Sequence, residues 1–283
     1  MSAETASAAA LPGAVPRHGR RNWLSRNGKL LIIAIPMVWL LLFFLAPFFV
    51  VWKISFAEVA IAQPPYTPLV SWNEGKILVT LNLGNYQYLI NDWLYIRAYF
   101  SSIKIAFFAT VLTLLVGYPM AYAIARSSDK WRNVLLMLVM LPFWTSFLLR
   151  IYAWIGFLKA NGVINNILMG LGIINEPLVF LQTDFAVYIG IVYTYLPFMI
   201  LPLYANLAKL DDTLLEASAD LGARPVTTFF KVTLPLSMPG VIAGSMLVFI
   251  PAIGEFVIPA LLGGPDTLMI GQVLWNEFFS NRD

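Results

Sequence analysis

Cysteine is absent from the sequence, and histidine occurs once, at His18. Without cysteine the chain can form neither disulfides nor thiolate metal sites. One histidine in a polar segment near the N-terminus provides none of the reactive clusters of known enzymes. The Gly-Lys pairs at 28–29 and 75–76 lack a phosphate-binding loop around them. We therefore expect no catalytic residue, no bound metal and no cofactor in this chain.

Charged residues are scarce as well, at 12% of the chain, whereas soluble domains contain roughly 25%. Hydrophobic residues make up 59%, so lipid is the expected surrounding medium. Five apolar stretches approach or exceed the ~20 helical residues that cross a bilayer. The first is too long to be the apolar core of a signal peptide, so it is predicted to be retained. We predict an all-α polytopic membrane protein with spans at 30–52, 103–125, 134–158, 185–207 and 240–262.

Lysine and arginine are distributed unevenly between the predicted loops. Eleven of the 18 lie in the N-terminal tail and in segments 126–133 and 208–239. These segments share one side of the membrane, and the positive-inside rule makes that side cytoplasmic, together with the N-terminus. The basic residues are not interleaved with stacking aromatics, so nucleic acid is not an expected partner. Residues 1–28 are predicted to be a disordered cytoplasmic tail and 29–283 a single transmembrane domain.

The loop at 208–239 carries the strongest local signals. Thr213-x-x-Glu216 fits a capping box, which predicts a helix beginning near Leu214. Gly222 is placed to end that helix in a left-handed cap, and Pro225 to begin the next one. The product is a helical elbow on the cytoplasmic membrane surface. Its geometry fits equally a lever that a partner moves and a passive interfacial helix.

The residues of this elbow resemble a known motif. Glu216-Ala217-Ser218-x3-Gly222-x9-Val232-x-Leu234-Pro235 is similar to the EAA loop of ABC importer permeases, with Ser218 in place of an alanine and Val232 in place of an isoleucine. Four further stretches resemble the polyamine (putrescine/spermidine) branch of these permeases, closest to the first permease subunits of bacterial putrescine importers. They are 141–146, 150–154, 221–225 and 254–259.

The resemblance implies a type I, MetI-like permease bundle in the bacterial inner membrane, surrounded by lipid. It would move polyamine, foremost putrescine, from periplasm to cytoplasm by alternating access. The implied partners are a second similar permease, a periplasmic polyamine-binding protein and two ATPase subunits, which bind the ATP and Mg. The family has a sixth span, which we expect this chain, ending at Asp283, to lack. The implied ATPase-coupling residues are Glu216, Ala217, Ser218, Gly222, Leu234 and Pro235, to which adjacency adds Arg224.

Arg150 and Glu255 fall well inside predicted spans, where burial in lipid is costly. Because an acidic group with aromatic faces suits an organic cation, Glu255 with Trp144 and Tyr152 is expected to line the substrate path. Two acidic residues, Asp184 and Glu277, would attract the cation at the outer mouth.

Structural roles stand beside these. Glu255 could instead pair with Arg150 or cap a broken helix, and the two aromatic residues could simply pack. Arg150 is expected near the outer end of its span, with its side chain reaching the interface. A secondary transporter or channel for organic cations is the alternative function, although neither would need a capped helix with the EAA spacing.

Overall fold

The structure is a computed structural model that describes residues 23–58, 60, 63, 66–73 and 76–281. Helices make up most of the described chain, which confirms the predicted fold class, and one pair of short strands is added to them. The chain divides into two compact units, residues 1–87 and 88–283. The boundary falls inside the short helix α3 (Gly84–Asn91), and each unit is described by itself.

A long helical rod begins the first unit. It consists of α1 (Trp23–Leu40), a π-helical turn η1 (Leu41–Leu45) and α2 (Ala46–Ile54). Its part Ile32–Ile54 has 23 residues, about 35 Å of helix, which exceeds a ~30 Å hydrocarbon core. This agrees with the span predicted at 30–52. The predicted tail lies outside the described residues up to 22, and residues 23–28 belong to α1.

The segment that follows this rod folds back onto the end of α2. Ser55 Oγ and the Tyr86 hydroxyl share a 2.7 Å hydrogen bond, and Asn85 Nδ2 donates to the carbonyls of Ser55 and Ala57 at 3.0 Å. The Tyr86 ring lies against Phe56 at 5.4 Å between centroids. Between these contacts, β1 (Val70–Asn73) and β2 (Lys76–Val79) pair antiparallel, with residue 70 opposite residue 79.

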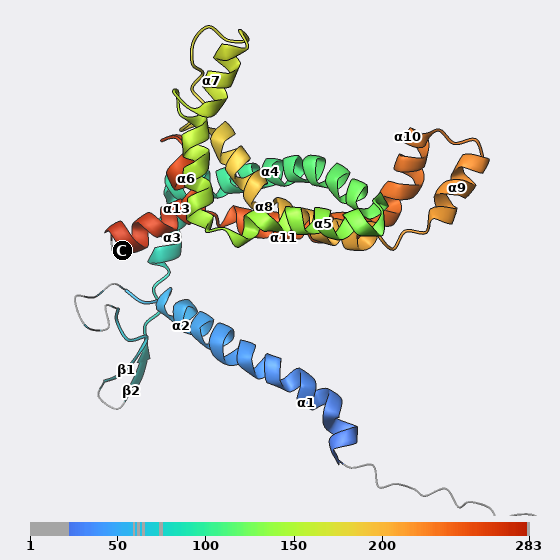
Figure 1. Cartoon of the computed structure of the whole chain (residues 1–283). Coiled ribbons are helices and arrows are strands. Elements are labelled where there is room, and N and C mark those ends of the chain that lie inside the picture. The colour runs from blue at the N-terminus through green and yellow to red at the C-terminus, as the bar shows by residue number, and fades with distance from the viewer. Residues whose placement is uncertain (1–22, 59, 61–62, 64–65, 74–75, 282–283) are drawn as a thin grey trace, which may run out of the picture. The chain divides into compact units, whose positions relative to one another are not determined.

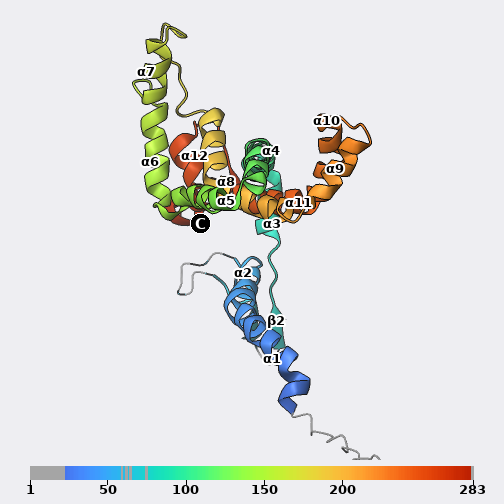
Figure 2. The ribbon, with the colours of Figure 1, turned by 45° about the vertical axis from the view of Figure 1, so that its right-hand side comes forward.

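Three long helices form the core of the second unit: α4 (Trp93–Arg126), α8 (Asp184–Leu207) and α11 (Leu234–Ile253). They pack along one another (Figures 1 and 2). α4 begins ten residues before the span predicted at 103–125. We call the end of this bundle that carries α9 and α10 the loop end, and the opposite end, with α6, α12 and α13, the far end (Figures 1 and 2).

A methionine between two glycines closes this bundle. Met199 of α8 is fully buried. A Cβ at Gly117 of α4 would lie 2.9 Å from Met199 Cγ, and one at Gly244 of α11 would lie 2.9 Å from Met199 Sδ. One turn away, a Cβ at Gly240 would lie 2.8 Å from Asn206 Cβ. The small residues of the Gly240-x-x-x-Gly244 pair thus let α11 approach α8 closely.

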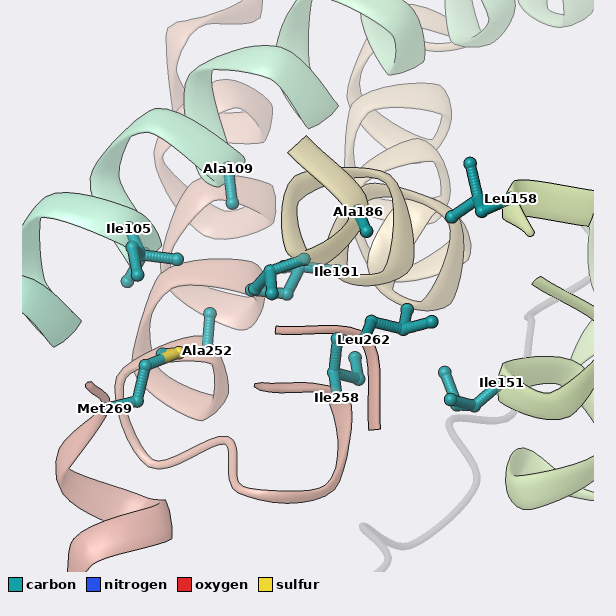
Figure 3. Packing of buried hydrophobic residues seen from close by; sticks show 12 residues of the cluster. Ile105, Ala109, Ile151, Leu158, Ala186, Ile191, Ala252, Ile258, Leu262 and Met269 are labelled. Atoms are coloured by element: carbon teal, nitrogen blue, oxygen red, sulfur yellow. The ribbon is translucent and has the colours of Figure 1, made fainter. Parts of the chain in front are cut away.

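An apolar cluster fills the far end of the bundle (Figure 3). Ile105 and Ala109 come from α4, and Ile191 comes from α8. Two shorter helices also contribute to the cluster, since Ile151 belongs to α6 (Phe147–Leu158) and Ile258 to α12 (Val257–Leu262). The far end is thus a packed assembly of several elements.

The span predicted at 134–158 is wrong as a single helix. The chain forms α5 (Asp129–Met140) and a 3-10 turn η2 (Leu141–Trp144), becomes extended at 145–146, and then enters α6. α5 runs alongside the bundle, whereas α6 and α7 (Val163–Gly170) run across it (Figures 1 and 2). Pro142, at the start of η2, lacks the N–H that a continuing α-helix would use. α5 and η2 together rise about 26 Å, close to a bilayer core.

The span predicted at 240–262 is also interrupted. α11 ends at Ile253, residues 254–256 leave the helix, and the short α12 follows. Beyond α12, α13 (Ile270–Trp275) continues into a π-helical segment η4 (Asn276–Asn281). Among the described residues, five segments are long and apolar enough to cross a membrane, the number predicted. Two of them, 147–170 and 225–253, have boundaries clearly different from those predicted.

Candidate functional site

The loop end carries a compact helical elbow between α8 and α11. α9 (Asp212–Asp220) and α10 (Pro225–Thr228) lie beside each other there (Figures 1 and 2). A π-helical turn, η3 (Phe229–Thr233), joins α10 directly to α11. The predicted elbow therefore exists, with Pro225 at the start of its second helix as expected.

The N-terminal cap of α9 differs from the prediction. Asp211 is the cap, since its Oδ1 accepts a 3.0 Å hydrogen bond from the amide of Thr213, and α9 begins at Asp212. The capping box from Thr213 to Glu216 is therefore wrong. Hydrogen bonds from Thr213 lower the pKa of the Asp211 carboxyl below its ordinary value. The Glu216 side chain is consequently exposed, with no hydrogen bond or ion pair to any described residue.

The C-terminal cap of α9 confirms the role predicted for Gly222. Its φ is +76°, in the left-handed region that glycine adopts without strain. The Gly222 amide donates to the Ala219 carbonyl at 2.8 Å, and the Ala223 amide to the Ser218 carbonyl at 3.1 Å. These two bonds form a Schellman motif. A Cβ at Gly222 would meet no atom within 4 Å, so glycine is needed here for its backbone conformation alone.

Two side-chain contacts fix α9 to its neighbours. Ser218 is buried, and its hydroxyl shares a 2.8 Å hydrogen bond with Thr228 Oγ1 of α10. The serine that departs from the motif alanine thus has a packing role of its own. Arg126, at the end of α4, forms an ion pair with Asp212. The elbow is therefore anchored to the bundle at its start and braced internally.

The outer surface of the elbow is open and mostly small or apolar. Leu221 is 88% exposed and Val226 is 67% exposed. Glu216, Ala217 and Arg224 are exposed as well. A cavity of about 620 Å³ lies among Tyr122 of α4, α9 and the α10–η3 segment, and the exposed Val226 is part of its lining. An exposed helix with small side chains can fit closely against another protein.

The elbow continues into α11 without a flexible joint. Leu234 and Pro235 are the first residues of α11 and follow η3 directly. In the same region the Tyr118 hydroxyl of α4 shares a 2.8 Å hydrogen bond with Ser237 Oγ. The Tyr118 ring meets Phe229 edge to face at 5.5 Å. The elbow and the start of α11 are therefore joined both through the chain and through contacts with α4.

Glu255 lies outside any long helix, in the break between α11 and α12, and its side chain is 8% exposed. Its Oε1 accepts hydrogen bonds from the amides of Val257 at 3.1 Å and Ile258 at 3.4 Å. Its Oε2 accepts a 2.6 Å hydrogen bond from the Tyr195 hydroxyl of α8. Of the roles considered from the sequence, the geometry is that of a cap on a broken helix.

Arg150 does not pair with Glu255, and it does not reach outward. It is 9% exposed in the first turn of α6, where its Nη1 donates to the carbonyl of Pro142. Its guanidinium also lies 5.8 Å and 5.9 Å from the ring centroids of Phe143 and Phe147. The expectation of a side chain reaching the interface is therefore wrong. Arg150 adds a charged donor to the Pro142 carbonyl of η2, which also accepts from the amide and hydroxyl of Thr145.

The other residues predicted for the substrate path lie in other elements than Glu255, and two of them are far more exposed. Trp144 in η2 is 70% exposed and Tyr152 in α6 is 58% exposed. Asp184, at the start of α8, accepts a 2.6 Å hydrogen bond from Thr267 Oγ1. Glu277, in η4, interacts electrostatically with Tyr95 at the start of α4. All four belong to segments gathered at the far end (Figures 1 and 2).

Sequence reasoning missed Tyr195 and Asp211, which hold Glu255 and α9 in place. Pairing across sixty residues leaves no local pattern, so Tyr195 could not have been found. Asp211 could have been, because aspartate is as strong a cap residue as threonine. Among residues 23–281, apart from the short gaps, no cluster of His, Asp and Glu could hold a metal ion.

The sequence of the chain is similar to that of a known protein family. The family model described as "Binding-protein-dependent transport system inner membrane component" matches residues 113–283. The spermidine/putrescine transport system permease protein PotB of Haemophilus influenzae is 42% identical over 251 residues, covering 89% of this chain and 83% of the relative. PotB of Escherichia coli K12 is 44% identical over 207 residues, 73% of this chain and 75% of the relative.

A solved structure shares the fold. It is a bacterial alginate ABC transporter in complex with an alginate pentasaccharide-bound periplasmic protein. One of its chains superposes with a TM-score of 0.62 at 19% identity, covering 93% of this chain and 88% of that chain. At this identity the likeness concerns the fold alone.

Proposed function

The chain belongs to the family of binding-protein-dependent transport system inner membrane components, and from this premise we propose that it is a permease subunit of an ATP-driven polyamine importer. Relatives of 42–44% identity are named for spermidine and putrescine together. We propose putrescine as the foremost substrate of this chain, moved from periplasm to cytoplasm by alternating access.

The observation that carries this proposal is the elbow of α9 and α10. It is capped at Asp211 and at Gly222, it leaves Glu216 free on its surface, and it continues into α11. A passive interfacial helix would not need this bracing. In the proposed importer the elbow docks on an ATPase subunit, with Glu216, Ala217, Gly222 and Arg224 at or beside the contact. Ser218 holds the elbow in shape, and Leu234 and Pro235 pass its movement to α11.

The remaining subunits of the proposed assembly supply what this chain lacks. Two ATPase subunits bind ATP and Mg, a second permease completes the path, and a periplasmic binding protein delivers the polyamine. The concentration of Lys and Arg in the tail and in segments 126–133 and 208–239 supports a cytoplasmic loop end and a cytoplasmic N-terminus. The far end then faces the periplasm.

For the substrate path we propose the exposed groups of the far end. Trp144 and Tyr152 present aromatic faces that are open within this subunit, where a second permease would close a path around them. Asp184 and Glu277 add acidic charge at the same end. Cation–π contacts of ~0.5–2 kcal/mol each would suit an extended organic cation. Glu255, 8% exposed, joins this path only if its capping carboxylate also attracts the passing cation.

The test is ATP hydrolysis by the assembled transporter in proteoliposomes, with the Glu216→Ala substitution in this subunit. Glu176→Ala is the matched control, because Glu176 is also exposed and without a partner among the described residues, but lies in the loop that follows α7. We expect Glu216→Ala to weaken ATPase retention in a pull-down and to reduce hydrolysis stimulated by the binding protein. Glu176→Ala should leave both unchanged.

Uptake of radiolabelled putrescine with unlabelled spermidine as competitor tests the substrate. Efficient uptake that requires ATP supports the importer. Uptake without ATP, or with Glu216→Ala behaving like the control, would favour a secondary transporter or channel for organic cations. Uptake of neither polyamine would overturn the substrate while leaving the coupling intact.

A further inference from the structure

The break between α11 and α12, residues 254–256, is held from three sides. The Glu255 carboxylate caps the first amides of α12 and receives the Tyr195 hydroxyl from α8. On a third side lies Gly271 of α13. A Cβ there would lie 2.4 Å from the Gly254 carbonyl oxygen and 2.8 Å from that of Glu255. Only glycine lets α13 rest directly on the break.

This clasp lies at the opposite end of α11 from the elbow. α11 has 20 residues, about 30 Å of helix, and begins where η3 ends. Gly240 and Gly244 keep it against α8 along part of that length. α11 is one continuous helix from the elbow to Gly254, with Pro239 and Pro251 inside it, so it offers a direct route by which motion of the elbow can reach the break.

Beyond Gly254 the chain continues into the short helices α12 and α13 and not into another long helix. α12 packs on α6 and α8, and α13 packs on α4. The Phe256 ring stacks on Trp275 of α13 at 4.5 Å between centroids and 11° between planes. Ser102 Oγ of α4 accepts a 2.7 Å hydrogen bond from the Ile270 amide at the start of α13. The far end is thus linked to α11 through the break.

On the proposed importer function, we propose that this break is the hinge that passes movement of α11 to α12 and α13, and that Tyr195 is a positioning residue for it. The Tyr195 hydroxyl acts through Glu255 and not on the substrate. It keeps the carboxylate over the amides of α12, so that movement of α11 at the break carries α12 with it. Without it, α11 can move while the far end stays behind.

The test separates movement from folding. Tyr195→Phe removes one hydroxyl and keeps the ring, which contacts Phe198 at 6.1 Å. Tyr193→Phe is the matched control on the same helix, because its ring meets Trp154 at 5.5 Å and its hydroxyl has no hydrogen bond to any described residue. Both variants are assembled with the partner subunits in proteoliposomes. ATP hydrolysis stimulated by the binding protein and uptake of radiolabelled putrescine are then measured on one preparation.

We expect Tyr195→Phe to retain stimulated hydrolysis while uptake per ATP falls about tenfold, the scale of one hydrogen bond to a charged group. Tyr193→Phe should match the wild type in both. A merely structural role for Tyr195 would reduce hydrolysis and uptake together and would overturn the proposal, as would unchanged uptake per ATP. If the wild type itself shows no stimulation, the importer function fails, which is a distinct result.

A second variant approaches the same hinge from α13. Gly271→Ala would press on the carbonyls of residues 254 and 255, whereas a Cβ at Gly156 of α6 meets nothing within 4 Å, which makes Gly156→Ala the control. Gly271→Ala should show the same loss of uptake per ATP. If it transports like Gly156→Ala, the three-sided clasp is not the hinge.

Discussion

Arg126 at the end of α4 forms an ion pair with Asp212 at the start of α9, and this pair joins the bundle to the elbow. The two side chains are 23% and 73% exposed, so solvent screens their attraction. The ion pair matters for where it holds the elbow, because it connects the first turn of the short helix α9 to the end of the 34-residue helix α4.

We predict that this ion pair contributes little to stability. A double-mutant cycle with Arg126→Ala and Asp212→Ala should give a coupling energy of ~0–1 kcal/mol in thermal unfolding, and salt should reduce it. The pair of Arg132 and Asp129, at 2.8 Å, is the control, since it lies within the first turn of α5. A coupling energy well above that of the control pair would contradict the prediction.

Asp211, and not Thr213, should control the start of α9. Asp211→Ala removes the acceptor for the Thr213 amide, and hydrogen exchange of α9 should become faster, whereas Thr213→Ala should leave it unchanged. Asp211→Asn keeps an acceptor oxygen and should restore protection.

The pH dependence of this cap has a definite sign. Because the pKa of Asp211 is lowered in the folded chain, the stabilisation is present above the ordinary carboxyl pKa of 3.8 and is lost as the pH falls through the lowered value. Exchange measured from pH 7 down to pH 5 should therefore show no loss of the cap. A transition in that interval would contradict the assignment.

Gly222→Ala should weaken the elbow through its backbone. A residue with a Cβ costs about 1–2 kcal/mol in the left-handed region. Gly172, at φ +69° after α7, has the same conformation and the same free space, so Gly172→Ala should cost a similar amount. Only Gly222→Ala should reduce hydrolysis stimulated by the binding protein. Equal loss of stimulation in both variants would mean that general destabilisation, and not the elbow, is responsible.

The contact of Gly244 with Met199 should be sensitive to a single methyl group. Gly244→Ala overpacks the α8–α11 contact and should destabilise the fold by about 1–3 kcal/mol. Gly156→Ala meets no neighbour and should be neutral or stabilising, by up to about 1 kcal/mol, through helix propensity. Thermal unfolding in detergent compares the two, and similar midpoints would show that α11 does not pack as closely as described.

Two substitutions of Glu255 distinguish a role as a helix cap from a role in the substrate path. Glu255→Gln can still accept from the amides of α12 and can donate to the Tyr195 oxygen, so a cap predicts uptake close to the wild type. Glu255→Ala loses all three hydrogen bonds of the carboxylate and should lose uptake. If Gln transports as poorly as Ala while assembling normally, the negative charge itself is required and the path role is supported.

Much of the elbow could be predicted because its signals are local. Gly222 and Pro225 act through their own backbone conformations, which the sequence shows directly. The cap was misplaced by two residues because Asp211 and Thr213 are both good caps. Glycine and proline thus predicted where the elements of the elbow end and begin, whereas two neighbouring polar residues left the first residue of α9 ambiguous.

The break in the third span was not predicted, and the break in the fifth span was considered only as one alternative role of Glu255, because long apolar stretches flank both breaks. Residues 134–158 read as one hydrophobic stretch, and Pro142 is compatible with a kinked span as well as with a turn. The break at Glu255 depends on a hydrogen bond from Tyr195, sixty residues earlier. Arg150 was misjudged for the same reason, since the carbonyl it satisfies became available only through the turn at 141–146.

The seat of Met199 between Gly117 and Gly244 also has a consequence for biogenesis. Gly117 belongs to α4, which is synthesised first, Met199 to α8, which follows, and Gly244 to α11, which comes last. The bundle therefore cannot close until α11 has entered the membrane. Until then Met199 can pack only against Gly117 of α4, and its other side is covered only when the fifth apolar segment reaches the bundle.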